Sequence, residues 1–276
     1  MFRIREEKMV WLKRLLLIVT FTLLAVFVYV LVKKVFFPST ADAPAGHMQQ
    51  IVKKPQSAPK PATPPPPPKP APDYTLPPIT GGLAPVLSRI PTSQPVVFLG
   101  IDDGGYKDLA EIDLMKANNI KATLFLSNAF ILDNPSFFKQ VSQQTGAVIE
   151  DHTLHHYIDL PYRSFAEQKA EICGEADYMQ QEYGRRPVLF RPPGGAYSVT
   201  TQEAAAACGM KAIINWIAKA NGGSMQYQIG NGLRSGDIVL MHFRPVFAQD
   251  MQAFVQAEKA AGLHTELLED WLTPGL

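Results

Sequence analysis

A run of five consecutive prolines, Pro64–Pro68, constrains this chain of 276 residues more than any other feature. Proline lacks a backbone N–H and has a fixed φ, so the run forms neither helix nor sheet and adopts extended polyproline II. Seventeen of the 24 prolines lie between residues 38 and 95. We therefore expect residues 33–94 to form a linker that precedes a globular domain over residues 95–276.

The charges differ on the two sides of this boundary. Residues 1–94 carry 12 Lys and Arg against 4 Asp and Glu, whereas residues 95–276 carry 14 against 21. An acidic domain is poorly suited to bind phosphate backbones, which excludes a nucleic-acid partner. A proline-binding protein could dock on the linker, but such domains are mostly intracellular, so the sequence implies no protein partner.

Residues 15–32 contain 18 consecutive residues without a charge. A helix of this length spans about 27 Å, close to the thickness of the hydrocarbon core of a bilayer. We predict a transmembrane anchor in preference to a buried core helix. A cleaved signal peptide is the other alternative, but the one candidate cleavage site, Ala41–Ala43, lies far from the apolar run and is followed by Pro44.

The basic residues of segment 1–14 place it in the cytoplasm by the positive-inside rule. The sequence thus predicts a single-pass protein of the cell membrane whose linker and domain are extracytoplasmic.

Strand and helix patterns alternate throughout the domain. Strands are predicted at 96–101, 122–126, 147–149, 188–190, 212–215, 238–241 and 263–266, and helices at 108–118, 136–144, 164–183, 200–209 and 248–261. The third and fourth predicted helices each begin with a capping box, Ser164-x-x-Glu167 and Thr200-x-x-Glu203. This alternation predicts an α/β domain with a parallel sheet that is closed or nearly so. In such barrels the chemistry lies at the C-terminal ends of the strands.

Polar residues gather at those strand ends. Asp102-Asp103-Gly104 follows the first strand, and Asp151–His156 (DHTLHH) follows the third. Later strands end in Arg191–Gly195 (RPPGG) and in His242. Each group alone has an ordinary explanation, such as a solvated turn or a hydrogen-bonded structural histidine. Together they place four of the six histidines on one rim, which indicates a site.

This set of side chains suits a mononuclear hydrolytic metal centre. The imidazoles of His152 and His156, four residues apart, can face one way, and one carboxylate completes three protein ligands. Such a centre keeps an open position for water, and the metal lowers the pKa of that water towards about 7. Zinc is the expected ion, although cobalt, nickel or manganese could occupy the same ligands.

The combination of DDG, HTLHH, RPPGG and GDIVLMH resembles the polysaccharide deacetylases, carbohydrate esterase family 4, over residues 96–271. The resemblance implies a distorted (β/α) barrel that removes acetyl groups from N-acetylated sugars. It also implies the following roles: Asp102 is the general base; Asp103, His152 and His156 bind the metal; Arg191 holds the base; His242 is the general acid; Leu240 lines the acetyl pocket; and the Gly194 amide serves the oxyanion.

Three positions depart from the family pattern. Gly194 stands where an aromatic residue is usual, and Gly100-Ile101 replaces the usual Thr-Phe. The motif that usually supplies an aspartate to support the catalytic histidine reads Ile214–Lys219 here, without a carboxylate near Asn215. His155 is expected to be a spare histidine at the surface or behind the ligands.

These observations support two main hypotheses. The first is a membrane-anchored, metal-dependent deacetylase of a cell-surface polysaccharide, with peptidoglycan or a chitin-like polymer as substrate. The second is a catalytically inactive, metal-containing module that binds carbohydrate or tethers the wall, favoured by the missing carboxylate. A purely structural zinc site fits less well, because polar catalytic groups accompany only three ligands.

The two cysteines, Cys173 and Cys208, both lie on the predicted extracytoplasmic side. An even number of cysteines in an oxidising compartment favours a disulfide, and two buried thiols are the alternative.

Overall fold

The domain is organised around one long buried strand, β2 (Val96–Asp103). The structure is a computed structural model that describes residues 71–275. The predicted tail 1–14, the anchor 15–32 and the linker up to residue 70 lie outside the described residues. Within residues 71–275, none of the helices has both the length and the apolar character that crossing a bilayer requires.

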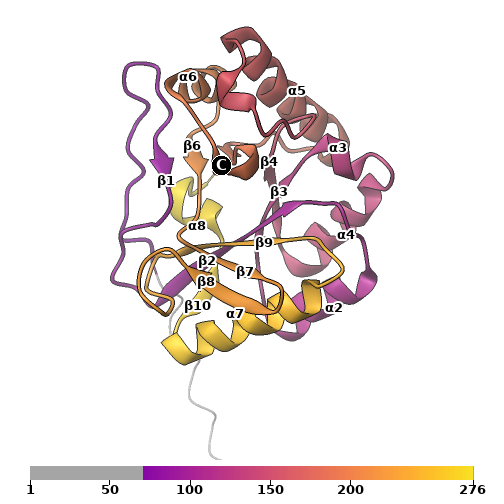
Figure 1. Cartoon of the computed structure of the whole chain (residues 1–276), viewed down its shortest axis with the longest axis vertical. Helices are drawn as coiled ribbons and strands as arrows, with labels where there is room; N and C mark the ends of the chain where they lie inside the picture. The colour runs from indigo at the N-terminus through magenta and orange to yellow at the C-terminus, as the bar shows by residue number, and fades with distance from the viewer. Residues whose placement is uncertain (1–70, 276) are drawn as a thin grey trace, which may run out of the picture. The chain divides into compact units, whose positions relative to one another are not determined.

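Figure 1 shows a largely parallel sheet with helices packed around it. The other strands are β1 (Val86–Leu87), β3 (Thr123–Leu126), β4 (Val148–Asp151), β5 (Leu189–Phe190), β6 (Ala212–Ile214), β7 (Ala218–Asn221), β8 (Ser224–Tyr227), β9 (Ile238–His242) and β10 (His264–Glu266). The helices are α2 (Leu109–Ala117), α3 (Asn128–Ile131), α4 (Pro135–Thr145), α5 (Phe165–Tyr183), α6 (Val199–Ala207), α7 (Phe247–Ala261) and α8 (Leu268–Leu272), with short 3₁₀ turns at Leu160–Tyr162 and Pro193–Gly195.

The strand order is β1-β6-β5-β4-β3-β2-β9-β7-β8, and β10 pairs with the start of β2. Only the β7–β8 pair is antiparallel among these strands. Because the order is an open path with β1 and β8 at its two ends, the domain is an α/β half-barrel. The prediction of an α/β fold with a parallel sheet is confirmed, whereas the sheet does not close within the described residues.

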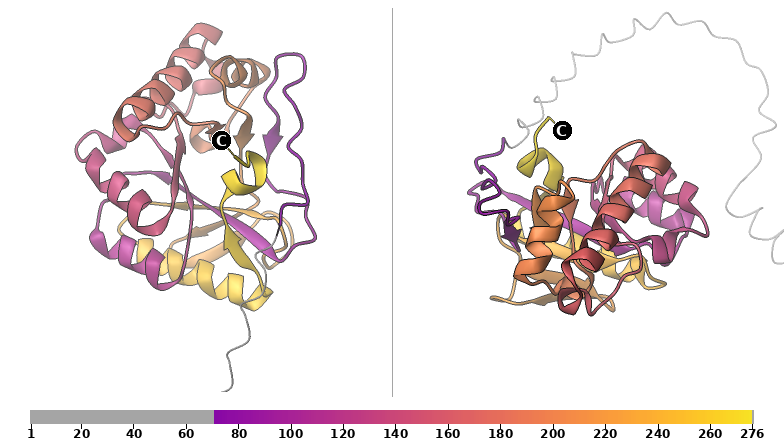
Figure 2. Two further views of the ribbon diagram at one scale, coloured as in Figure 1. Left: turned by 180° about the vertical axis from the view of Figure 1, so that it is seen from behind. Right: turned by 90° about the horizontal axis from the view of Figure 1, so that it is seen from above.

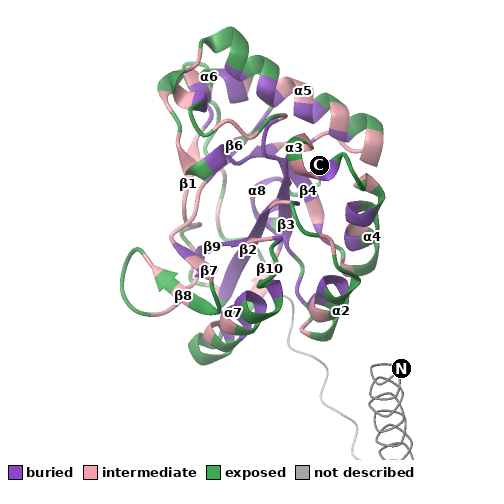
Figure 3. Cartoon of the chain, turned by 45° about the vertical axis from the view of Figure 1, so that its right-hand side comes forward, coloured by how far each residue is buried: buried purple, intermediate pink, exposed green. Residues whose placement is uncertain are grey.

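Side chains of β2 alternate between two cores, as a pleated strand requires. Val97, Leu99 and Ile101 pack in the cluster that also takes residues from α2, α4 and α7. Val96 and Phe98 point to the opposite, inner face, where Trp271 of α8 packs edge-on against Phe98. Figure 3 shows these central strands as buried and the outward faces of α5 and α7 as largely exposed. Because side chains alternate along the strand, Phe98, Gly100 and Asp102 all lie on this inner face.

The structure differs from the sequence-based expectations in several places, and the short helices α3 and α8 were not predicted. The N-cap of helix α6 lies two residues earlier than predicted, because Ser198 and Thr201 form its capping box rather than Thr200 and Glu203. Residues 218–227 form the β7–β8 hairpin, which was not predicted. Part of the segment assigned to the linker belongs to the domain, since β1 pairs with β6 and Ala84 and Ile90 are fully buried. Both views of Figure 2 show this segment, in indigo, at one edge of the domain.

The two cysteines form a disulfide between neighbouring helices. Cys173 lies on α5, and Cys208 caps the C-terminus of α6. Around them, Ile172, Ala204 and Ile213 contribute to a third apolar cluster between these helices and the sheet. The bond thus crosslinks two helices at a well-packed interface.

Candidate metal centre

Two consecutive aspartates at the end of β2 both reach the same site, which a regular strand would not allow. Asp102 continues the inner face of β2 and is 2% exposed. Regular alternation would send Asp103 to the opposite face. Asp103 instead has a φ of 73°, in the left-handed region, so the chain turns there and the Asp103 carboxylate faces the histidines. The strand end thereby supplies two carboxylates with different surroundings.

Asp103, His152 and His156 converge on one point. Asp103 Oδ1 lies 3.2 Å from His156 Nε2 and 3.5 Å from His152 Nε2. One ligand atom from each residue lies within 4.8 Å of the other two. The two imidazole centroids are 4.9 Å apart, and the His156 ring also packs edge-on against Phe130. Among the described residues this is the one group of three or more potential ligands that meets this criterion.

The tautomer of His152 fits metal binding. His152 Nδ1 lies 2.6 Å from the carbonyl oxygen of Arg191, so Nδ1 carries the proton and donates it. Nε2 then presents a lone pair towards Asp103. A hydrogen bond from the far ring nitrogen to a carbonyl is the arrangement that orients metal-binding histidines. The donor set of two imidazole nitrogens and one carboxylate oxygen is one that zinc accepts in catalytic sites.

Backbone strain concentrates at this centre. Four non-glycine residues have positive φ in the described part of the chain, and three of them are Asp103, Thr153 and His156. Such conformations cost of order 1–3 kcal/mol each and persist where the surroundings enforce them. Here Thr153 N–H donates to Asp151 Oδ1, and His156 N–H donates to Thr153 Oγ1. These local bonds fold the segment after β4 into a tight turn that brings both imidazoles to one side.

The electrostatics of the triad favour an ionised Asp103. Burial raises the pKa of Asp103, but contacts with His152 and His156 outweigh it and hold that pKa well below its usual range. Burial lowers the pKa of His152, but Asp102 and Asp103 outweigh it, so this pKa lies above its ordinary value. The carboxylate is therefore ready to bind a cation over the physiological pH range.

Arg191 clamps the other carboxylate. It is fully buried, and its Nη1 donates to Asp102 Oδ1 at 2.7 Å. Its Nε donates to the carbonyl oxygen of Ile214 at 3.0 Å, and its guanidinium lies over the Phe125 ring, 4.1 Å from the centroid. Asp102 Oδ2, in contrast, lies 3.8 Å from His152 Nε2 and so faces the triad. One oxygen of Asp102 is thus held, and the other is directed at the site.

His242 is at the same rim without a fixing partner. It lies at the end of β9, in register with Asp102 on the neighbouring β2. Burial lowers the pKa of His242, and Asp102 and Asp103 raise it, with a net decrease. Its ring makes no hydrogen bond or ion pair within the described residues. Asn215 does not supply one, because its side-chain amide donates to the carbonyl oxygen of Gly195 at 3.1 Å.

The remaining predicted site residues are near this rim but contribute in different ways. Leu240 is 4% exposed on β9 and lies in register with Gly100 of β2. Gly194 is exposed in the loop after β5 with a φ of 65°, so its glycine identity fits the backbone there. His155 points away from the triad, since its Nδ1 contacts Glu171 Oε1 at 2.7 Å.

Sequence reasoning missed one residue near the site, Arg244. The Arg244 guanidinium lies 3.9 Å from Asp103 Oδ2 and 3.5 Å from Asn221 Oδ1 at the β7–β8 hairpin. Its place two residues after His242 was a usable signal, because that position shares the same rim. Gly100, noted from the sequence only as a departure from the family pattern, lies against Arg191, and a lone glycine inside an apolar strand often marks such a close approach.

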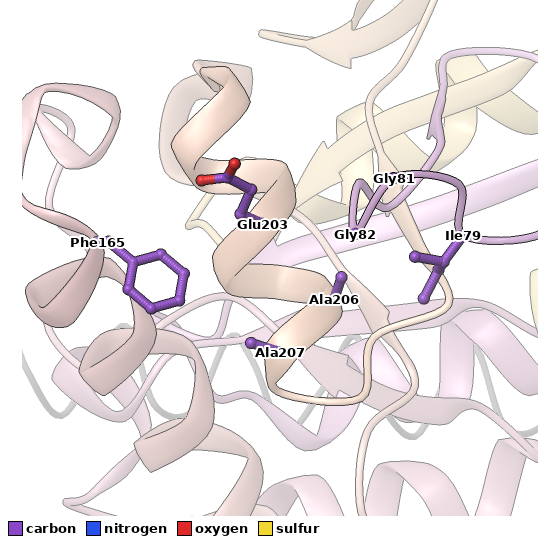
Figure 4. A pocket seen from close by; sticks show the side chains of 7 residues that line it. All are labelled: Ile79, Gly81, Gly82, Phe165, Glu203, Ala206 and Ala207. Atoms are coloured by element: carbon purple, nitrogen blue, oxygen red, sulfur yellow. The ribbon is translucent and has the colours of Figure 1, made fainter.

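A separate open groove of about 590 Å³ lies beside α6 (Figure 4). It is lined by Ile79, Gly81, Gly82, Phe165, Glu203, Ala206 and Ala207. Its lining is mostly apolar, and it contains none of the predicted site residues.

Comparison with known proteins connects this geometry to one family. The sequence profile of a family described as polysaccharide deacetylase matches residues 89–213. This range contains the metal triad, Asp102 and Arg191, and it ends before His242.

The similar proteins include two curated relatives and one solved structure. An uncharacterized protein of Streptomyces coelicolor is 35% identical over 199 residues, which are 69% of this chain and 78% of that protein. A peptidoglycan-N-acetylglucosamine deacetylase of Bacillus cereus is 27% identical over 56% of this chain and 75% of its own length. In structure, the chain resembles a mutant, with restored enzymatic activity, of a family 4 carbohydrate esterase pseudoenzyme whose wild type comes from Bacillus anthracis. That match has a TM-score of 0.59 and 20% identity, and it covers 70% of this chain and 73% of the other.

Proposed function

The chain belongs to the polysaccharide deacetylase family of carbohydrate esterase family 4, hydrolases that act on N-acetyl amides, and on this premise we propose that it deacetylates a cell-surface polysaccharide, with peptidoglycan as the substrate. The proposal rests on the contacts of the Asp102 carboxylate: Arg191 holds Oδ1, and Oδ2 faces the metal triad. The similarity to a peptidoglycan-N-acetylglucosamine deacetylase supports the choice of substrate.

Asp103, His152 and His156 would hold a divalent cation, for which zinc is our first choice and cobalt, nickel and manganese are alternatives. Their donor atoms converge, and the His152 tautomer leaves Nε2 free for a metal. When bound, such a cation supplies Lewis acidity that polarises an amide carbonyl and lowers the pKa of a water molecule.

The chain's own groups would carry the protons. Asp102 Oδ2 accepts a proton from the attacking water, because Arg191 occupies only Oδ1 and keeps the carboxylate oriented. His242, on the neighbouring strand, gives a proton to the nitrogen of the leaving amine. The amide N–H of Gly194 serves the developing oxyanion, and Leu240 borders the space for the acetyl methyl group.

One observation favours a second candidate function. His242 has no carboxylate partner within the described residues, and a neutral, unoriented imidazole is a poor general acid. The same fold occurs in a protein described as a pseudoenzyme. An inactive module that keeps the metal and binds the polysaccharide is therefore the alternative.

An acetate-release assay tests these two functions. The full chain is incubated with peptidoglycan and with chitooligosaccharides, with a chelator, and after addition of zinc or cobalt. We expect acetate release that the chelator abolishes and added metal restores. Stoichiometric bound metal with no release from either polymer would instead support the binding module.

We also propose that residues 15–32 anchor the protein in the cell membrane, with residues 1–14 in the cytoplasm and the domain held outside by the proline-rich linker. The proposal is supported by the 18-residue apolar run, the basic tail before it and the five consecutive prolines after it. We expect the full chain to remain with membranes after alkaline carbonate extraction and to be digested by protease added to intact spheroplasts. Release by carbonate, or a domain protected from protease, would contradict this topology.

A further inference from the structure

The Arg244 guanidinium lies beside the metal triad, and its two polar contacts with described residues are both long. Its Nη2 is 3.9 Å from Asp103 Oδ2, and its Nη1 is 3.5 Å from Asn221 Oδ1. The side chain is 45% exposed. A guanidinium has five N–H donors, so most of the donors of Arg244 are available to a ligand that enters the site.

The loop that carries Arg244 is fixed by its neighbours. Phe243 is 2% exposed, and its ring packs edge-on against Phe138 and stacks on Phe247. The carbonyl oxygen of Arg244 accepts a hydrogen bond from the Phe247 N–H at 2.9 Å. The backbone of Arg244 is therefore anchored to the core and to α7, and its side chain is held at the rim of the site.

The same side of the site carries a second cation. Lys219 of β7 is in register with Leu240 of β9, so both side chains lie on the inner face of the sheet. Lys219 is half-buried, and its ammonium forms no hydrogen bond or ion pair in the part of the chain that the structure describes. Residues 95–276 as a whole carry 14 basic against 21 acidic side chains. Two cations without a close counter-ion, on one side of a site in an acidic domain, indicate a ligand with negative charge.

We propose that Arg244 is a specificity-determining residue that binds a carboxylate of the substrate, namely the lactyl carboxylate of N-acetylmuramic acid. The planar guanidinium of arginine can pair with both oxygens of a carboxylate. In this sugar the lactyl ether and the acetamido group are on adjacent ring carbons. An acetamido group at the triad, which the proposed deacetylation requires, therefore brings the lactyl carboxylate close to Arg244. N-acetylglucosamine has a neutral hydroxyl group at that carbon.

Peptidoglycan offers carboxylates from two sources, the lactyl groups of its glycan strands and the stem peptides attached to them. Where a strand bears a peptide, the lactyl carboxyl group is an amide and has no charge. The proposal therefore predicts a preference for strands from which an amide hydrolase has removed the peptide.

The first arm of the test measures binding and needs no activity. The full chain carrying Asp102→Asn, which keeps the substrate intact, is titrated calorimetrically with a tetrasaccharide of alternating N-acetylglucosamine and N-acetylmuramic acid. The same tetrasaccharide with its carboxyl groups converted to methylamides is the neutral comparison. With Arg244 present, the free acid should bind at least roughly 10-fold more tightly than the methylamide, the size expected of one charge-assisted contact. With Arg244→Gln added, the two should bind with equal affinity.

The second arm is kinetic and compares kcat/KM for the same two tetrasaccharides. Arg244→Gln should lower the ratio of free acid to methylamide roughly 10-fold. Arg244→Lys should keep part of the ratio, because it retains the charge but not the paired donors. Arg186→Gln is the matched control, since Arg186 is 38% exposed, pairs with Asp177 and precedes β5 at the opposite end of the strands. The native ratio should also fall as salt is raised from about 0.05 M to about 1 M, because a partly exposed ion pair is screened.

Three results would overturn the proposal. Equal losses on both tetrasaccharides in Arg244→Gln would mean that Arg244 acts through Asp103 and does not read the substrate. Equal affinity of the native chain for free acid and methylamide would exclude the contact. Tighter, Arg244-dependent binding of a peptide-bearing tetrasaccharide would assign the carboxylate to the stem peptide. A native chain that prefers the free acid through Arg244 but releases no acetate would instead refute the deacetylase proposal and keep this inference.

Discussion

The two carboxylate oxygens of Asp102 have different contacts. Oδ1 neutralises a buried guanidinium, and Oδ2 faces the three potential metal ligands. A buried carboxylate is costly unless it is paired, so the contact with Arg191 lets an ionised base exist inside the half-barrel. The neighbouring Asp103 differs in its environment, because histidines rather than an arginine surround its carboxylate.

Replacing this carboxylate with an amide tests the division of roles. Asp102→Asn should lower kcat by about 10²–10⁴, the usual contribution of a general base, while metal content stays stoichiometric. Acetate release and elemental analysis on the same preparation measure the two effects. Asp113→Asn serves as the control, since that side chain is 80% exposed on α2. Loss of metal from Asp102→Asn would mean that the roles of the two aspartates are exchanged.

Removing one imidazole tests the ligand set. His156→Ala should weaken metal binding by more than the roughly 10–100-fold typical of losing a residue that only supports a ligand. Competition with a chelating dye gives the affinity. The adjacent His155→Ala is a stringent control, because His155 pairs with Glu171 instead of facing the triad. Unchanged affinity in His156→Ala would remove this residue from the site.

At this scale the sequence predicted which residues meet but not how they are held. The strand ends brought Asp103, His152 and His156 to one rim, as expected for parallel strands. The positive φ of Asp103 could not be predicted, because it depends on where the histidines finally lie.

At the scale of elements, the glutamates of two capping boxes have pKa values shifted in opposite directions. In α2, Glu111 accepts from the Asp108 N–H but is 3% exposed, and burial raises the pKa of Glu111 to about 8. In α5, the exposed Glu167 accepts from Ser164, which lowers the pKa of Glu167.

These shifts predict opposite pH dependences of stability. The raised pKa of Glu111 means that the folded chain holds this proton more tightly than the unfolded chain does. The resulting contribution to stability is complete below pH 4.5 and is lost as the pH rises towards 8. Glutamine keeps the capping box without titrating, so Glu111→Gln should gain Tm relative to the native chain between pH 5 and 8. Glu167→Gln is the counterpart: it should lose Tm at neutral pH and match the native chain near pH 3. Parallel pH profiles for native and Glu111→Gln would exclude the shift.

The elements that sequence analysis missed have weak patterns of their own. Strands β7 and β8 (AKAN and SMQY) are short, half-exposed and polar, so neither periodicity nor β-propensity stands out. The Asn221-Gly222-Gly223 turn between them was the usable signal. In contrast, β2 and α5 were predicted closely, because an apolar run and a capping box are strong local signals.

At the scale of the whole molecule, the disulfide closes a loop that spans β5 and the RPPGG turn. Cys173 and Cys208 are 35 residues apart, and closing such a loop stabilises by up to about 4 kcal/mol. A Cys173→Ala, Cys208→Ala variant should therefore lower Tm by on the order of 10 °C. Calorimetry of the variant, and of the native chain with and without reductant, measures this. A Tm that is unaffected by either change would show that the crosslink contributes nothing.

Arg191 contacts strands β2 and β6 and the aromatic ring of Phe125 on β3 from a fully buried position, whereas the ring of His242 makes no hydrogen bond within the described residues. In a descendant that lost its activity, removing either Arg191 or Asp102 alone would still leave an unpaired buried charge, which destabilises the fold. Selection for folding alone would preserve most of the signature motifs long after catalysis had ended, but it would let residue 242 drift. In surveys of related genomes, a retained arginine at position 191 and aspartate at position 102 therefore identify the architecture, and a retained histidine at position 242 is the better marker of a working enzyme.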